Sequence, residues 1–253
     1  FVNKVNINYI KENKLFLIYT PILIATLCVV GFFYFKEFFL LIFFASNVYH
    51  VTRQSFGVMN LYTKDSNCKK SWANIIYLFN FLFFLIAFFR FYIPVIEKEY
   101  LILLNLMVIS IIIITLFYQL KKFNFSENFL TLVTGILIFY PVCFVSNPVH
   151  AIIMGVTMHY SQYLYLTSKV LRKRNSILES PYKKNKLNSF FAIIFFYALV
   201  MSILSIFGKN DSEFLRNLIF IPITGQMLHF YLDSQLWKFS VDHNRKNILT
   251  FLK

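Results

Sequence analysis

Charged residues are scarce in this sequence. Of its 253 residues, 14% are charged, 58% are hydrophobic and 20% are aromatic. A soluble domain has about 25% charged residues. Glycine and proline occur only six times each, which excludes a low-complexity chain, and no internal repeat or Gly/Ser linker interrupts the sequence. The composition therefore predicts an all-α, polytopic transmembrane helical bundle that forms a single domain over residues 1–253.

Cysteines and acidic residues are also few. Cys28, Cys68 and Cys143 are dispersed and have neither the spacing of a metal site nor that of a disulfide framework. The 25 lysines and arginines outnumber the 11 acidic residues, which gives a net charge of +14. In a soluble protein this excess would suggest nucleic-acid binding. Here the basic residues lie between apolar runs, so the expected partner is the lipid bilayer with its anionic headgroups, and no nucleic acid.

The apolar runs predict about eight membrane spans, since one span needs about 20 mostly apolar residues. Short polar or proline-containing segments separate them. Pro148 is expected to break the helix between the fifth and sixth spans, and Pro222 is expected to kink the eighth. The expected spans are 15–35, 38–56, 72–93, 100–120, 129–145, 149–167, 187–207 and 215–239.

The loop charges predict the orientation of these spans. Three basic clusters, at 64–70, at Lys121-Lys122 and at 169–186, fall in alternate loops, and the loops between them are nearly neutral. Because cytoplasmic loops carry the excess of lysine and arginine, both termini are expected in the cytoplasm. The expected location is a bacterial inner membrane. The chain begins at Phe1 rather than at a methionine, so we expect a few residues to precede it.

Three histidines lie inside the expected spans, in the second, sixth and eighth. They are His50, His159 within Met158-His159-Tyr160-Ser161-Gln162, and His229. All three spans run from outside to inside, and each histidine falls in the middle or inner half of its span. Ionisable groups at membrane depth are costly and usually face the protein interior. Three imidazoles at one level therefore predict a shared metal ion.

Each of these histidines has polar neighbours three or four residues away, on its own helix face. We expect Asp233 to be a fourth ligand or to accept an imidazole N–H, and Gln54 and Gln162 to orient ligands or a bound water. Arg53 is expected to bind a carboxylate or a headgroup. His150 would join the site only if Pro148 and Gly155 distorted its helix. The neighbours are Asn47, Arg53 and Gln54 for His50, Gln162 and Tyr163 for His159, and Gln226 and Asp233 for His229.

Other interpretations of the histidines stay open from the sequence. Two of them could hold a haem, all three could line a proton or ion path, or each could simply be hydrogen-bonded within the bundle. A three-histidine set, with or without a carboxylate, suits iron, copper or zinc. We take iron as the expected metal, with another transition metal as the alternative.

The stretches Tyr49-His50, Met158-His159-Tyr160 and Leu228-His229, with Asp233 following, resemble the Brp/Blh type of bacterial β-carotene dioxygenase. This resemblance implies a multi-span membrane protein in which histidines from several helices hold non-haem iron, and an activity that splits β-carotene to retinal. Where that family has paired histidines on one later helix, this chain has His159 followed by Gln162. The His-x-x-His-His boxes of membrane desaturases and alkane hydroxylases are absent.

Taken together, the residues predict a membrane-embedded, metal-dependent oxidoreductase or oxygenase that acts on a lipophilic small molecule. His50, His159 and His229 would bind the metal, and Asp233, Gln54 and Gln162 would support the chemistry. A small membrane carrier or a proton-conducting protein is the alternative. A third possibility is a structural subunit with membrane-protein partners.

Overall fold

The computed structural model describes residues 4–62, 66–91, 93, 98–123, 127–143, 148–177, 183–207 and 212–252. Every secondary-structure element in these ranges is a helix, which confirms the all-α fold class. The elements are α1 (Lys4–Glu12), the π-helix η1 (Leu15–Tyr19), α2 (Thr20–Tyr34), α3 (Lys36–Tyr62), α4 (Ser66–Phe91), α5 (Lys98–Phe123), α6 (Glu127–Leu137), the 3₁₀-helix η2 (Tyr140–Cys143), α7 (Pro148–Ile177), α8 (Lys183–Phe207), α9 (Glu213–Asn217), α10 (Phe220–Leu236), α11 (Asp242–Asn244), the π-helix η3 (Arg245–Leu249) and α12 (Thr250–Leu252).

The chain folds into two compact units. We call Phe44–Gln162 the middle unit, and Phe1–Phe43 with Tyr163–Lys253 the terminal unit. Two helices, α3 and α7, begin in one unit and end in the other. The expectation of a single domain over the whole chain stays a prediction.

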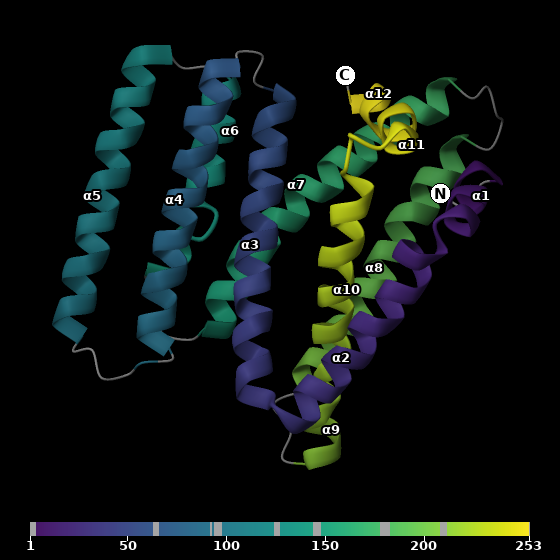
Figure 1. Ribbon diagram of the computed structural model, residues 1–253, viewed down its shortest axis with the longest axis horizontal. Coiled ribbons are helices and arrows are strands. Elements are labelled where there is room, and N and C mark those ends of the chain that lie inside the picture. Colours follow the sequence, from purple (N-terminus) through teal and green to yellow (C-terminus); the bar gives the residue numbers. More distant parts are fainter. Residues whose placement is uncertain are drawn as a thin grey trace. The chain divides into compact units, whose positions relative to one another are not determined.

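In the middle unit, α4 packs against both α5 and α6 (Figure 1). Their shared core is aromatic and aliphatic, and it includes the fully buried Phe79, Phe83 and Ile136. Trp72 is also buried there, and its indole N–H donates to Oε1 of Gln119 at 3.0 Å. This bond ties α4 to α5 in the apolar core, where a polar group without a partner would be costly.

The expected fifth span at 129–145 is wrong as one continuous helix. The 11-residue α6 ends at Leu137, and the 3₁₀-helix η2 follows. Pro141 explains the end, because proline has no N–H to donate and disfavours α-helix at the residue before it. The carbonyl of Gly135, which the helix end leaves without its usual partner, accepts a bond of 2.9 Å from Nδ2 of the buried Asn80.

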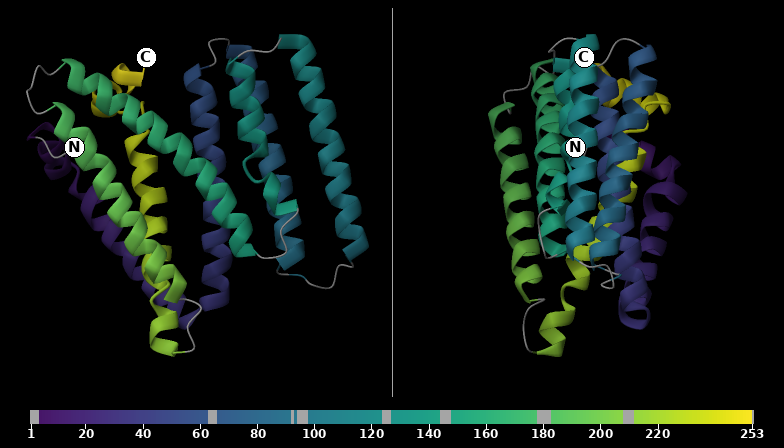
Figure 2. Two further views of the ribbon diagram at one scale, coloured as in Figure 1. Left: turned by 180° about the vertical axis from the view of Figure 1, so that it is seen from behind. Right: turned by 90° about the vertical axis from the view of Figure 1, so that its left-hand side faces the viewer.

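In the terminal unit, α10 packs against α2 and α8, and the second view of Figure 2 shows α8 beside the lower part of α10. Cys28 and Phe32 of α2 are buried in the contact with α10. On α3, the ring of Phe43 stacks on Phe230 of α10, with centroids 6.4 Å apart. These contacts hold α10 along most of its length.

The expected eighth span at 215–239 is divided into the short α9 and the 17-residue α10. Pro222 lies in the first turn of α10, where a missing N–H is tolerated. The carbonyl of Leu218 accepts from the N–H of Ile221 instead, at 3.1 Å. The kink expected at Pro222 is therefore a short interruption one turn before the proline.

The C-terminal segment after Trp237 folds back as short helices. Asn244 is buried, and its side-chain nitrogen donates to the carbonyls of Gln235 and Lys238. Hydrogen bonds from Lys246 and Arg245 hold the pKa of the exposed Asp242 below its ordinary range. The last helical turns are thus anchored both to α10 and to each other.

Four segments of the described chain are long and apolar enough to cross a membrane, and these four contain no histidine. They correspond to the expected first, third, fourth and seventh spans. The total of about eight spans and the cytoplasmic termini stay predictions. The four segments are Leu15–Tyr34, Lys70–Phe91, Glu99–Lys121 and Ser189–Phe207.

Candidate metal centre

In the middle unit, His50 of α3 and His159 of α7 lie against each other. Their ring centroids are 4.9 Å apart and the rings meet edge to face, with an interplanar angle of 78°. His159 is 1% exposed, and His50 is half-buried. Two histidines that are 109 positions apart in sequence are thus brought into contact by two helices that pass through this unit.

Three amide side chains extend this pair along its own helices. Asn47 and Gln54 lie one turn before and one turn after His50 on α3, and Gln162 lies one turn after His159 on α7. Both polar side-chain atoms of Asn47 and of Gln54, and Oε1 of Gln162, are buried and make no hydrogen bond to any residue that the structure describes. Buried polar groups nearly always have a partner, so this set calls for a bound polar group or water.

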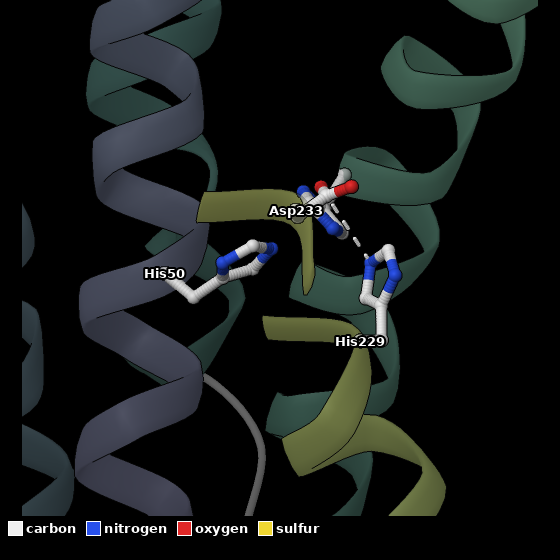
Figure 3. A group of neighbouring side chains, drawn as sticks. His50, His229 and Asp233 are labelled. Carbon is white, nitrogen blue, oxygen red and sulfur yellow. Dashed lines mark ion pairs between the residues drawn. The ribbon is translucent and has the colours of Figure 1, made fainter. Parts of the chain in front are cut away.

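In the terminal unit, α10 supplies a second pair, His229 and Asp233. His229 Nε2 lies 3.8 Å from Asp233 Oδ2, and the two side chains are 22% and 3% exposed. Their spacing of four residues places them on one helix face. Figure 3 shows this pair on α10 with the ion pair as a dashed line, and it shows His50 extending from α3.

Aromatic side chains pack around the His229–Asp233 pair. The ring of Tyr163, on α7, lies edge-on to His229 with centroids 5.5 Å apart, and its hydroxyl is within reach of the Asp233 carboxylate. Trp237 packs edge-on to Tyr163, with centroids 6.0 Å apart. This packing restricts the His229 ring and encloses the carboxylate.

The distances within each pair suit ligands of one metal ion. Imidazole nitrogens about 2.1 Å from a metal place the centroids of neighbouring rings roughly 4.6–5.3 Å apart. The His50–His159 separation of 4.9 Å falls in this range. For a nitrogen and an oxygen ligand the expected separation is about 3.0–3.4 Å. The 3.8 Å between His229 and Asp233 is slightly longer and needs only a small side-chain rotation.

His50, His159, His229 and Asp233 form a group that could hold a metal ion. The group supplies three neutral nitrogen donors and one anionic oxygen donor. Transition metals such as iron and zinc favour this donor type, whereas Mg²⁺ and Ca²⁺ favour oxygen donors. The expectation of a histidine set with one carboxylate is confirmed to this extent, and the identity of the metal stays a prediction.

Two expected residues do not join these pairs. Arg53 is exposed, and its Nη1 donates to the hydroxyl of Tyr49 at 2.9 Å, one turn earlier on the outer face of α3. This bond to a phenol does not test the expected contact of Arg53 with a carboxylate or a headgroup, which stays a prediction. His150 lies in the first turn of α7, and its side chain is outside the described part of the structure.

Tyr163 and Asn47 were expected only as polar neighbours of candidate ligands, without a specific role. Tyr163 follows His159 by four residues, and Asn47 precedes His50 by three. That spacing was the available signal, because it places each on the face of its helix that carries the histidine. It could not show that Tyr163 contacts His229, since that contact joins two different helices.

No protein-family model matches the chain, and comparisons with curated proteins and with solved structures find no match either. Function is therefore inferred from the residues and their geometry.

Proposed function

We propose that this chain is a membrane-embedded, metal-dependent oxidoreductase that acts on a lipophilic substrate, with non-haem iron as the metal. The observation that carries this proposal is the group of three histidines and one aspartate, whose donors suit a transition metal. The resemblance of the same histidine stretches to bacterial β-carotene dioxygenases favours iron and oxygenase chemistry. The apolar helices favour a substrate that enters from the lipid.

Two continuous helices support the assignment of both pairs to one ion. On α7, His159 and Tyr163 are one turn apart on one face, and Tyr163 contacts His229. On α3, Phe43 and His50 are seven residues apart, also on one face, and Phe43 contacts Phe230. On each helix, the histidine therefore shares one face with a residue that contacts α10.

The residues have distinct roles in this proposal. His50, His159 and His229 bind the ion as neutral imidazoles. Asp233 is the fourth ligand or orients His229 by accepting its N–H. Tyr163 fixes the His229 ring by packing and can donate a hydrogen bond to Asp233. Iron held by three histidines and one carboxylate keeps open positions for oxygen and substrate.

The test is an element-specific measurement of metal in the purified protein, together with a titration of the metal-free protein with Fe(II) and Co(II). We expect one ion per chain. His50→Ala alters the middle unit and His229→Ala alters the terminal unit, and each should lower the affinity for that one ion. The control is His243→Ala, because His243 stacks on Tyr9 and lies outside the group.

Two results would contradict the proposal. One is a folded wild-type protein that binds neither metal more tightly than the double variant His50→Ala/His229→Ala does. The other is two ions per chain, each lost by only one of the single substitutions, because separate sites in the two units would then replace a shared one.

A further inference from the structure

Five buried amide atoms flank the histidine pair of the middle unit and make no hydrogen bond within the described part of the chain. They are Nδ2 and Oδ1 of Asn47, Nε2 and Oε1 of Gln54, and Oε1 of Gln162. Asn47 is 0% exposed, so bulk solvent does not solvate it. Each such group that stays unsatisfied weakens folding, and native proteins contain few of them.

Amides with a structural role in the same unit make at least one hydrogen bond to another helix, although Oδ1 of Asn80 has no partner among the described residues. The side-chain nitrogen of Asn80 donates to the carbonyls of Ile76 and Gly135, at 2.8 and 2.9 Å. Oε1 of the buried Gln119 accepts from the indole of Trp72. These amides join helices to each other. Asn47 is as deeply buried and Gln54 is partly buried, but within the described residues neither side chain makes a hydrogen bond.

The position of the amides indicates what they serve. Asn47, His50 and Gln54 follow one another at intervals of three and four residues, so they form one stripe on α3. Gln162 stands in the same relation to His159 on α7. The amides are therefore placed one helical turn from the imidazoles on both helices, where a molecule that reaches the histidines would meet them.

We propose that Asn47 and Gln54, with Gln162, bind a hydroxyl or carbonyl group on an otherwise apolar ligand, so that the substrate is an oxygenated lipid and not a pure hydrocarbon. The role of this ligand as a substrate rests on the proposed function, but the existence of the binding site does not. A primary amide offers both donors and an acceptor, and it can therefore satisfy an alcohol or a ketone. A hydrocarbon in the same place would leave all five atoms unsatisfied.

The test is an equilibrium competition in nanodiscs of neutral lipid, with radiolabelled 1-hexadecanol as the probe. The competitors are 1-hexadecanol, 2-hexadecanone and hexadecane, and empty nanodiscs correct for partition into lipid. We expect the alcohol and the ketone to bind roughly tenfold or more tightly than the hydrocarbon, because sites built for hydrogen bonds reject analogues that lack them.

Two near-isosteric variants locate the site. In Gln54→Met and in Asn47→Leu the preference for the alcohol should fall to about threefold or less, while the ligand-free protein should melt at a higher temperature, since unsatisfied buried amides are replaced by apolar groups. The matched control is Gln235→Met on α10, a glutamine whose Nε2 pairs with Ser234. Gln235→Met should change neither the preference for the alcohol over the hydrocarbon nor the binding site.

Equal affinity of the wild type for the alcohol and the hydrocarbon would overturn the inference, because water alone would then satisfy the amides. A lower melting temperature of both variants with an unchanged preference would also overturn it, because the amides would then be structural. Every measurement is repeated with EDTA. A preference that persists without metal, in a chain that binds no metal, would leave this inference standing while the proposed function fails.

Discussion

Replacement of His159 by glutamine separates a metal ligand from a structural histidine. Glutamine keeps a donor and an acceptor in a side chain of similar length, so a histidine that is only hydrogen-bonded should tolerate the change. Amide groups are poor ligands for transition metals, which prefer imidazole. His159 is 1% exposed and contacts His50, which makes it the most enclosed ligand of the group.

The expected size of the effect follows from the number of ligands. Four-ligand structural zinc sites bind with an apparent free energy of about 10–16 kcal/mol, which is roughly 2.5–4 kcal/mol per ligand. Loss of one ligand of four should therefore weaken binding by a factor of about 70 to 900 at 25 °C. The loss should be similar for Co(II), which allows the site to be followed by its visible absorption.

The assay is a Co(II) titration of the metal-free protein in detergent, with thermal unfolding of the same samples to verify the fold. His243→Gln is the matched control, because His243 is half-buried against Tyr9 and outside the group. Co(II) binding by His159→Gln within about threefold of the wild type would refute the assignment of His159 as a ligand, since a lost ligand should cost far more. Weaker binding with an unchanged melting temperature would support it.

Three further outcomes are expected. Asn80→Leu should destabilise the protein by about 1–3 kcal/mol in thermal or urea unfolding, because the buried carbonyl of Gly135 loses its donor, and an unchanged stability would show that this bond contributes little. Arg172→Gln with Lys173→Gln should weaken binding of phosphatidylglycerol roughly tenfold or more at low salt in native mass spectrometry, because both are exposed basic side chains on α7, and a salt-independent affinity would argue against it. Hydrogen bonds from its basic neighbours lower the pKa of Asp242, so the stability it contributes should be present above the unfolded-state pKa of about 3.9 and be lost as the pH falls through the lower folded-state value. Unfolding of the wild type and of Asp242→Asn between pH 7 and 3 measures this contribution. A stability difference between the two proteins that grows toward acid pH would contradict the expected loss.

Helix periodicity predicted those parts of the site that depend on one helix. The relation between His229 and Asp233 follows from their spacing on α10, and the structure places the two side chains 3.8 Å apart. The contact between His50 and His159 depends on how α3 and α7 are rotated about their axes. Sequence gives the depth of each histidine but not that rotation, so the contact itself could only be a hypothesis.

The fold was predictable where a run is long and uniformly apolar, but a bond from a distant residue that stabilises a helix end was not predictable. The 129–145 run is apolar enough for a span, yet α6 ends at Leu137. Pro141 is a local signal for this end. The bond from Asn80 to the carbonyl of Gly135 is not, because its two residues are 55 positions apart in sequence.

The helices divide into two kinds, and the division indicates where function lies. The four apolar segments that could cross a membrane carry no histidine, and the one in α8 is exposed along its length within the structure, with Phe195 71% and Ile193 69% exposed. The histidines and amides of the candidate site are confined to α3, α7 and α10. A polar group at membrane depth is costly on any helix, so packing needs alone would not gather these groups on three of them. Substitutions of one apolar residue for another at the exposed positions of α8 should therefore change lipid contact and little else, whereas apolar substitutions on the histidine-bearing faces should change ligand binding before they change the fold.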